Sequence, residues 1–148
     1  MTAYLLDTNL LLRAVQREAS AHSLAVEAMA TLLTNGHELF ITPQILIEFW
    51  AVATRPIDAN GLGWSSALVQ TEIERLRRLF SWLDDNDQVF SNRLQIVSGY
   101  NVQGKQVHDA RLVAVMQTYQ VTHLLTFNVD DFRRYQDINI WHPDQIVA

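Results

Sequence analysis

The chain has 148 residues, of which 49% are hydrophobic and 18% charged, and its formal net charge at pH 7 is −5. This length and composition predict one folded domain, residues 1–148, with a sizeable core, and they exclude a disordered chain. The acidic balance argues against a surface that is basic throughout, as general nucleic-acid binders have, but it allows a local basic patch.

The chain has no cysteine, which excludes disulfide bonds and thiolate metal sites. Any bound metal must therefore have oxygen or imidazole ligands. No segment approaches the ~18 continuous apolar residues of a membrane span, and the first residues do not have the pattern of a signal peptide. We therefore expect a soluble, cytoplasmic protein that does not enter a membrane.

Short apolar runs alternate along the chain with segments of helical periodicity. Strands are expected at residues 3–6, 38–41, 88–90, 123–126 and 138–140. Helices are expected at residues 10–15, 22–34, 43–54, 65–83, 91–98 and 107–119. Thr42 is placed to cap the third helix, with Pro43 at its first position. The alternation predicts an α/β fold of three layers, in which a mainly parallel sheet of about five strands is flanked by helices.

Acidic and amide side chains occur at element ends that such a sheet brings to one edge. Asp7 closes the first strand, Glu48 lies inside an apolar helix, and Asp109 lies in the first turn of another helix. Asn128 and Asp131 follow the fourth strand. Ligands of open α/β sheets bind at the carboxyl ends of the strands. Acidic groups gathered there repel one another unless a cation lies among them, and oxygen ligands suit Mg²⁺ or Mn²⁺.

Each acidic residue also has a purely structural explanation. Asp7 is placed to cap a helix, and a helix dipole favours Asp109 near an N-terminus. Asp131 fits a solvated turn. Glu48 is the hardest to explain in this way, because carboxylates are rarely buried without a partner. The joint pattern, more than any single residue, favours a metal centre.

Four sequence segments resemble, in order and spacing, the motifs of PIN-domain ribonucleases. These segments are Leu5–Asn9, Ile47–Glu48, Val107–Leu112 and Leu125–Phe132. The resemblance extends over almost the whole chain and is greatest to the bacterial VapC-type toxins of type II toxin–antitoxin pairs. It implies a PIN-like fold and a Mg²⁺- or Mn²⁺-dependent endonuclease that acts on RNA.

On this resemblance, Asp7, Glu48 and Asp109 occupy the first three acidic positions of the family. The fourth position is ambiguous, because this chain has Asn128 after the threonine and Asp131 before the phenylalanine. The implied metal ligands are all five of these residues, and the implied catalytic residues are the four acidic ones. Whether one metal ion binds or two is left open.

The resemblance also implies supporting residues and partners. Thr8, Asn9 and Thr126 would orient the metal ligands or the substrate. The implied partners are an RNA substrate, a cognate antitoxin and a second copy of the chain. A homodimer would join two sites into one groove and so help a small acidic protein to hold RNA.

Two other functions are compatible with part of the pattern. A phosphohydrolase of haloacid-dehalogenase type needs Asp-x-Asp after the first strand, but the third position here is Asn9, which cannot act as an acid. A non-catalytic PIN-like module that binds RNA or protein is compatible with Asn128. The intact Asp7, Glu48 and Asp109 argue against such a module.

Two neighbours of Asp109 are expected to have other roles. His108 is adjacent in a helix, where successive side chains point about 100° apart, so we expect it to lie away from the site. Arg111 is expected to form a surface ion pair.

Overall fold

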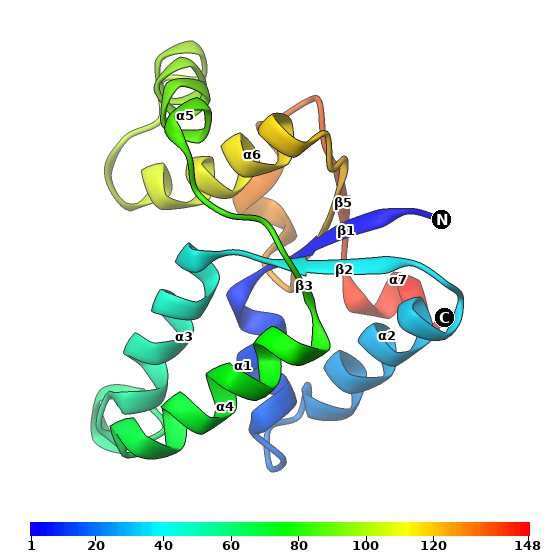
Figure 1. The fold of residues 1–148 in the computed structure, drawn as a ribbon, viewed down its shortest axis with the longest axis vertical. Helices are drawn as coiled ribbons and strands as arrows, with labels where there is room; N and C mark the ends of the chain where they lie inside the picture. Colours follow the sequence, from blue (N-terminus) through cyan, green and yellow to red (C-terminus); the bar gives the residue numbers. More distant parts are fainter.

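The computed structural model describes residues 1–148 and contains a five-stranded sheet whose neighbouring strands are all parallel. The strand order is β3-β2-β1-β4-β5 (Figure 1). The strands are β1 (Ala3–Leu6), β2 (Glu38–Ile41), β3 (Ser81–Trp82), β4 (His123–Leu125) and β5 (Asn139–Trp141). The register pairs Leu5 with Phe40 on one side and with Leu124 on the other. The predicted α/β fold with a parallel sheet is confirmed.

Seven α-helices connect the strands and cover both faces of the sheet. They are α1 (Thr8–Val15), α2 (His22–Thr34), α3 (Pro43–Thr54), α4 (Ser66–Leu79), α5 (Asp87–Gly99), α6 (Val107–Tyr119) and α7 (Pro143–Val147). Helices α5 and α6 lie on one side of the sheet, whereas α1, α2, α4 and α7 lie on the other (Figure 1). Single 3₁₀ turns occur at Ile57–Ala59 (η1), Gly104–Gln106 (η2) and Val129–Phe132 (η3). None of the helices has the length and apolarity needed to cross a membrane.

The core is one cluster of 33 buried hydrophobic residues drawn from the sheet and from helices on both sides. Leu5 and Leu6 of the central strand are fully buried, as expected for a parallel sheet that is covered on both faces. In α6, residues 112–116 are all buried, because this helix packs between the sheet and α5. The sequence prediction of a central helix at 107–119 is confirmed.

Elements with clear end signals match their predicted bounds. Helices α2, α3 and α6 and strands β1 and β2 begin and end at the predicted residues. At the start of α3, the Thr42 side chain accepts a hydrogen bond from the Ile45 N–H at 3.3 Å, and Pro43 occupies the first helical position. The capping residue therefore sets where α3 begins.

The third strand was predicted in the wrong place. Helix α4 ends at Leu79, short of the predicted residue 83, and Ser81 and Trp82 pair with β2 instead. Residues 88–90, predicted as a strand, belong to α5, which is capped by the Asn86 side chain through the Val89 N–H at 3.0 Å. The error has a physical cause. Phe80 and Leu83 are buried although they lie beyond the end of α4, and their spacing of three residues continues the apolar stripe of that helix, so the pattern predicted a longer helix.

The last two elements also differ from the prediction. Strand β5 covers Asn139–Trp141, one residue later than predicted, and α7 was not predicted at all. Helix α7 is short, and its capping box is made by the side chains of His142 and Gln145. Histidine is not among the residues that usually cap helices, so the sequence gave little indication that a helix begins here.

The order of the strands defines where a ligand site is expected. From β1 the chain first adds β2 and β3 on one side, and it later adds β4 and β5 on the other. The switch point therefore lies between β1 and β4, at their carboxyl ends. Crevices at such points are the usual ligand sites of open α/β sheets.

Candidate active site

Asp7 lies at the switch point, directly after β1. Its backbone N–H donates to the carbonyl of Leu125 in β4 at 3.0 Å, which ties it to the neighbouring strand. The side chain is buried, with 8% of the residue exposed. Its carboxylate accepts hydrogen bonds from the Thr8 N–H at 2.8 Å and the Thr126 hydroxyl at 2.8 Å. A third bond comes from the Asn9 amide at 3.2 Å. Asp7 caps α1, as the structural explanation expected, but hydrogen bonds from Asn9 and Thr126 also fix the orientation of its side chain.

The surroundings of Asp7 oppose its negative charge. Burial raises the pKa of Asp7 to about 6, although hydrogen bonds from Thr126 and Thr8 favour the ionised form. The charges of Glu48 and Asp131 raise this pKa further. At neutral pH the carboxylate is thus ionised against the preference of its environment, a preference that a nearby cation would reverse.

Thr126 and Asn9 form a small network around Asp7. The Asn9 amide donates to the Thr126 hydroxyl oxygen at 3.3 Å, and its carbonyl accepts from the Phe127 N–H at 3.2 Å. The same Thr126 oxygen accepts from the Asn128 N–H at 3.0 Å. These bonds tie the segment after β4 to the start of α1, so Asn9 and Thr126 hold the Asp7 carboxylate in one orientation.

Glu48 is linked to the same centre from α3. The Thr8 hydroxyl donates to its Oε1 at 3.3 Å, and the Gln44 amide donates to the same oxygen at 3.1 Å. Its charge raises the pKa values of both Asp7 and Asp109. The polar residue inside an apolar helix segment therefore faces the other acidic side chains, as predicted.

Asp109, in the first turn of α6, is the most strongly perturbed of the acidic groups. Burial raises its pKa to about 7, and the charges of Asp7, Asp131 and Glu48 each raise it further. Arg134 is the one group that lowers it. Charge effects of this kind fall off steeply with distance. We therefore infer that four carboxylates, from four different elements, lie close together.

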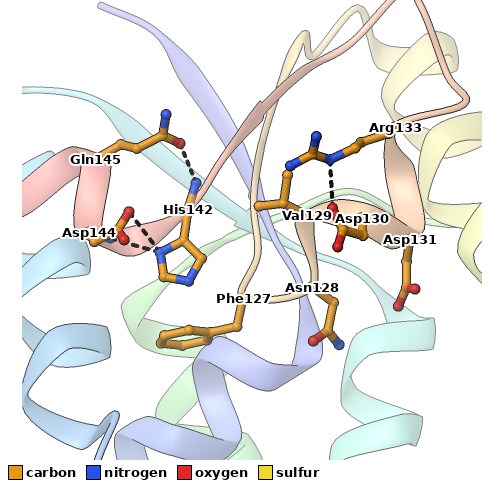
Figure 2. A pocket seen from close by; sticks show the side chains of 9 residues that line it. All are labelled: Phe127, Asn128, Val129, Asp130, Asp131, Arg133, His142, Asp144 and Gln145. Carbon is orange, nitrogen blue, oxygen red and sulfur yellow. Dashed lines mark hydrogen bonds and ion pairs between the residues drawn. The ribbon is translucent and has the colours of Figure 1, made fainter.

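Asn128 and Asp131 lie at the outer side of this group and are exposed. Both line an open cavity of about 630 Å³ between η3 and the start of α7 (Figure 2). The charge of Asp131 acts on Asp7 and Asp109, whereas Asn128 contacts the network through its backbone N–H to Thr126. Of the two residues at the ambiguous fourth position, Asp131 is therefore the one that adds charge to the centre.

The donor set suits a hard divalent cation. No three His, Asp or Glu side chains lie close enough together to hold one metal ion directly. Mg²⁺ commonly keeps several waters and takes only one or two carboxylates, so it does not need three. Burial, and after it the charges of neighbouring carboxylates, raise the pKa values of Asp7 and Asp109, and a bound cation would offset both effects. The oxygen atoms of these side chains are therefore suitable ligands for Mg²⁺ or Mn²⁺, although they do not surround one ion completely.

Gln44 is the contributor that sequence reasoning missed. It is buried in the first turn of α3 and contacts Glu48 and the backbone carbonyl of His108. The signal in the sequence was a polar side chain four residues before Glu48 in an otherwise apolar segment, since residues at that spacing share a helix face.

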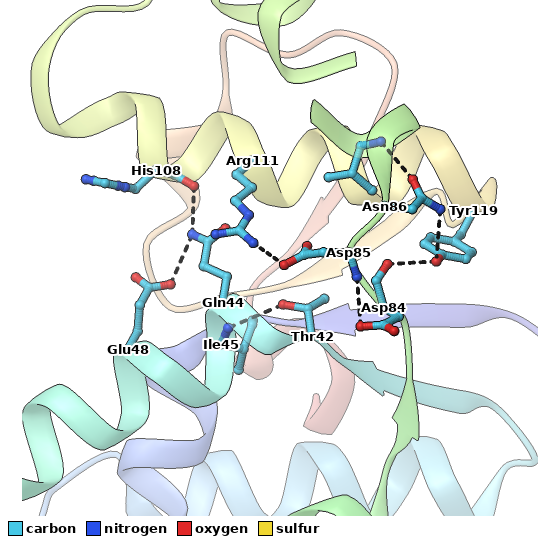
Figure 3. A network of polar contacts seen from close by, with 11 residues as sticks. Thr42, Gln44, Ile45, Glu48, Asp84, Asp85, Asn86, His108, Arg111 and Tyr119 are labelled. Atoms are coloured by element: carbon cyan, nitrogen blue, oxygen red, sulfur yellow. Dashed lines mark hydrogen bonds and ion pairs between the residues drawn. The ribbon is translucent and has the colours of Figure 1, made fainter. Parts of the chain in front are cut away.

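Of the two neighbours of Asp109, Arg111 forms the expected ion pair, whereas His108 lies nearer to the acidic group than expected. The His108 side chain is exposed, and its recorded contact with the network is made by its backbone carbonyl. Arg111 forms an ion pair with Asp85, in the segment between β3 and α5 (Figure 3). Both residues line a second cavity, of about 460 Å³, next to Glu48.

Several solved structures have this fold. A chain in the crystal structure of VapBC2 from Rickettsia felis bound to a DNA fragment from their promoter matches with a TM-score of 0.70, at 14% identity over 95% of this chain and 98% of that one. A chain of DNA-bound VapBC from Salmonella typhimurium matches with a TM-score of 0.71, at 17% identity over 97% and 99%. VapC20 from Mycobacterium tuberculosis, described as a sarcin-ricin loop cleaving toxin, matches with a TM-score of 0.61, at 15% identity over 82% and 86%. At these identities the likeness shows a shared fold.

The sequence match to a protein family is more specific than the likeness of fold. No curated protein sequence matches the chain significantly. The family model of the PIN domain matches residues 4–138, which include all of β1 but its first residue, the acidic group and all the helices except α7. The chain therefore belongs to the PIN-domain family.

Proposed function

We propose that the chain is a metal-dependent endoribonuclease, folded as one nuclease domain, that acts in the cytoplasm as the toxin of a toxin–antitoxin pair. The observation that carries the proposal is the group of four carboxylates at the switch point of the sheet, in which the charges of Glu48 and Asp131 act on both Asp7 and Asp109. Family membership supports a nuclease. The likeness to VapC20, described as cleaving the sarcin-ricin loop, supports RNA as the substrate and a toxin as the role.

The proposal assigns the metal to the most perturbed carboxylates. Asp7 and Asp109 would hold Mg²⁺ or Mn²⁺, with Glu48 acting directly or through water. Asp131 supplies the remaining charge, and Asn128 can add a carbonyl oxygen but no charge. A bound divalent ion would lower the pKa of a water molecule and offset the charge that develops on the phosphate.

The protein's own groups have separate tasks in this scheme. Thr8, Asn9 and Thr126 keep the Asp7 carboxylate oriented through the hydrogen bonds described above. Glu48 Oε1 is held by two donors, whereas Oε2 has no hydrogen-bond partner in the protein. We assign Oε2 to receive the proton of the attacking water.

Substrate binding needs local positive charge, because the chain as a whole carries a net charge of −5. Arg134 lies close enough to Asp109 to lower its pKa, and Arg133 lines the cavity beside Asn128 and Asp131. These two arginines are the cations we expect to contact RNA phosphates next to the cleaved bond.

Cleavage of a mixed RNA pool by the purified protein tests the proposal. We expect cutting with Mg²⁺ or Mn²⁺ and none with EDTA. A small phosphate ester should not be turned over, which separates this enzyme from a phosphohydrolase of haloacid-dehalogenase type. Metal binding without cleavage of any RNA would contradict the proposal and favour a non-catalytic module.

The partner assignment is supported by an apolar groove on the face opposite α5 and α6. Its walls come from α1, α2 and α4, and ten of its eleven lining residues are hydrophobic. Val26, Leu33 and Leu79 in this groove are exposed. Exposed apolar hollows of this kind accept the apolar face of a partner helix, and we assign this one to the antitoxin.

Substitution within the groove should separate toxicity from neutralisation. We expect expression of the chain to arrest growth of a bacterial host. An antitoxin, identified by selecting cells that survive this expression, should restore growth. Leu79→Glu should remain toxic in the presence of that antitoxin, because burying an unpaired carboxylate in the groove is unfavourable. Equal neutralisation of the variant and the wild type would place the antitoxin elsewhere.

We also propose that two copies of the chain associate. Ile47 on α3 and Phe90 on α5 expose 70% and 57% of their surface, and each lines a hollow that also contains Asp85 and Arg111, so the two apolar side chains lie on one part of the surface where a second copy could cover them. Light scattering should give twice the 17.0 kDa chain mass. A monomer at micromolar concentration would contradict this assignment.

A further inference from the structure

Gln44 connects two of the acidic residues through one amide group. It lies one helical turn before Glu48 on α3, with 7% of its surface exposed. Its Nε2 donates to Glu48 Oε1 at 3.1 Å and to the His108 carbonyl at 2.8 Å (Figure 3). His108 immediately precedes Asp109, so the amide joins Glu48 to the turn that carries Asp109.

This bridge spans two helices that barely touch elsewhere. Helix α3 packs mainly on α1 and α4, whereas α6 packs mainly on α5. The Gln44 amide therefore provides a specific polar link between the Glu48 helix and the Asp109 helix.

The orientation of the amide follows from its partners. Glu48 Oε1 and the His108 carbonyl are both acceptors, so the NH₂ group must face them. The Gln44 carbonyl oxygen is consequently buried without any hydrogen-bond partner. An unsatisfied buried acceptor is destabilising, and an apolar side chain of the same length would avoid it. The cost of this orphan acceptor offsets part of what the two hydrogen bonds of the amide contribute to stability, so stability alone is a weak reason for a glutamine at this position.

The amide also decides which oxygen of Glu48 is free. Gln44 and Thr8 both donate to Oε1, and Oε2 receives no donor. The carboxylate is therefore held with one oxygen engaged and the other available.

We propose that Gln44 is a positioning residue, which holds Glu48 and the Asp109 turn in register with Asp7 for binding of the divalent metal. The inference rests on the proposed nuclease function and adds a residue to it. Gln44 itself touches neither substrate nor metal in this scheme; it acts through Glu48 and through the backbone of His108.

Gln44→Met removes the donors and the orphan carbonyl while keeping the length of the side chain. We expect the dissociation constant for Mn²⁺, measured by calorimetry, to rise about tenfold, and RNA cleavage to fall about 10–100-fold. The urea midpoint of the metal-free protein should stay the same or rise. Gln117→Met, at an exposed position of α6, is the matched control and should match the wild type in every measurement.

The measurements separate the positioning role from its alternatives. Wild-type Mn²⁺ affinity and cleavage in Gln44→Met would overturn the inference. A fall in the urea midpoint that parallels the loss of metal binding would overturn it too, since Gln44 would then be structural. A wild-type protein that neither binds Mn²⁺ nor cuts RNA contradicts the nuclease function itself, and the wild-type sample alone reveals this.

Discussion

Asp7→Asn is expected to reduce RNA cleavage by about two to three orders of magnitude or more while leaving the protein folded. The substitution keeps the volume of the side chain but removes the charge that the metal needs. It also presents an NH₂ group where the carboxylate now accepts bonds from Thr8, Asn9 and Thr126. Both changes act at the group that lies closest to the switch point.

Single-turnover cleavage, with circular dichroism to confirm the fold, measures this effect. Asp58→Asn, at an exposed residue of η1 whose charge is not among those that shift the pKa of Asp7 or Asp109, is the charge-matched control and should cut at the wild-type rate. An Asp7→Asn protein that still cuts RNA at the wild-type rate would refute the assignment of Asp7 as a metal ligand.

Asp109→Asn is expected to abolish cleavage and, unusually for an active-site change, to stabilise the metal-free protein at pH 8. The pKa of Asp109 is raised to about 7, above its ordinary value of 3.8, and its side chain makes no hydrogen bond that asparagine would lose. The folded state therefore holds a proton that the unfolded state releases. As pH rises from 4 toward 7, the free energy of unfolding of the metal-free wild type should fall.

Asp7 adds to the same trend, because its raised pKa corresponds to roughly 3 kcal/mol lost over this pH range. Thermal unfolding without metal should show Asp109→Asn melting roughly 3 °C or more above the wild type at pH 8, with the gap narrowing toward pH 4. Added Mg²⁺ should stabilise the wild type at pH 8 and have little effect on the variant. A variant that is less stable than the wild type at pH 8 would show that Asp109 has a structural partner.

The fold and the acidic residues were predictable for different reasons. Helices α2, α3 and α6 have strong end signals, such as Thr42 and Pro43 before α3, and these signals act within a few residues. Asp7 and Asp109 were predictable because each interrupts an apolar segment at a recognisable motif. Local sequence is sufficient for features of this kind.

Features that depend on distant contacts were not predictable. Strand β3 has two residues and exists because Ser81 and Trp82 pair with β2, about forty residues earlier in the chain. The contact of Gln44 with the His108 carbonyl joins residues separated by 64 positions. The nearness of Asp131 to the acidic group also needed the structure, because only the packing shows that its charge acts on Asp7 and Asp109.

We propose above all that the group formed by Asp7, Glu48, Asp109 and Asp131 is a divalent metal centre. Anomalous X-ray scattering from crystals grown with Mn²⁺ tests it most directly, because the signal locates the ion and identifies its ligands. At least one Mn²⁺ peak should lie in contact with the carboxylates of Asp7 and Asp109. Mn²⁺ bound only elsewhere, at a concentration that supports RNA cleavage, would contradict it.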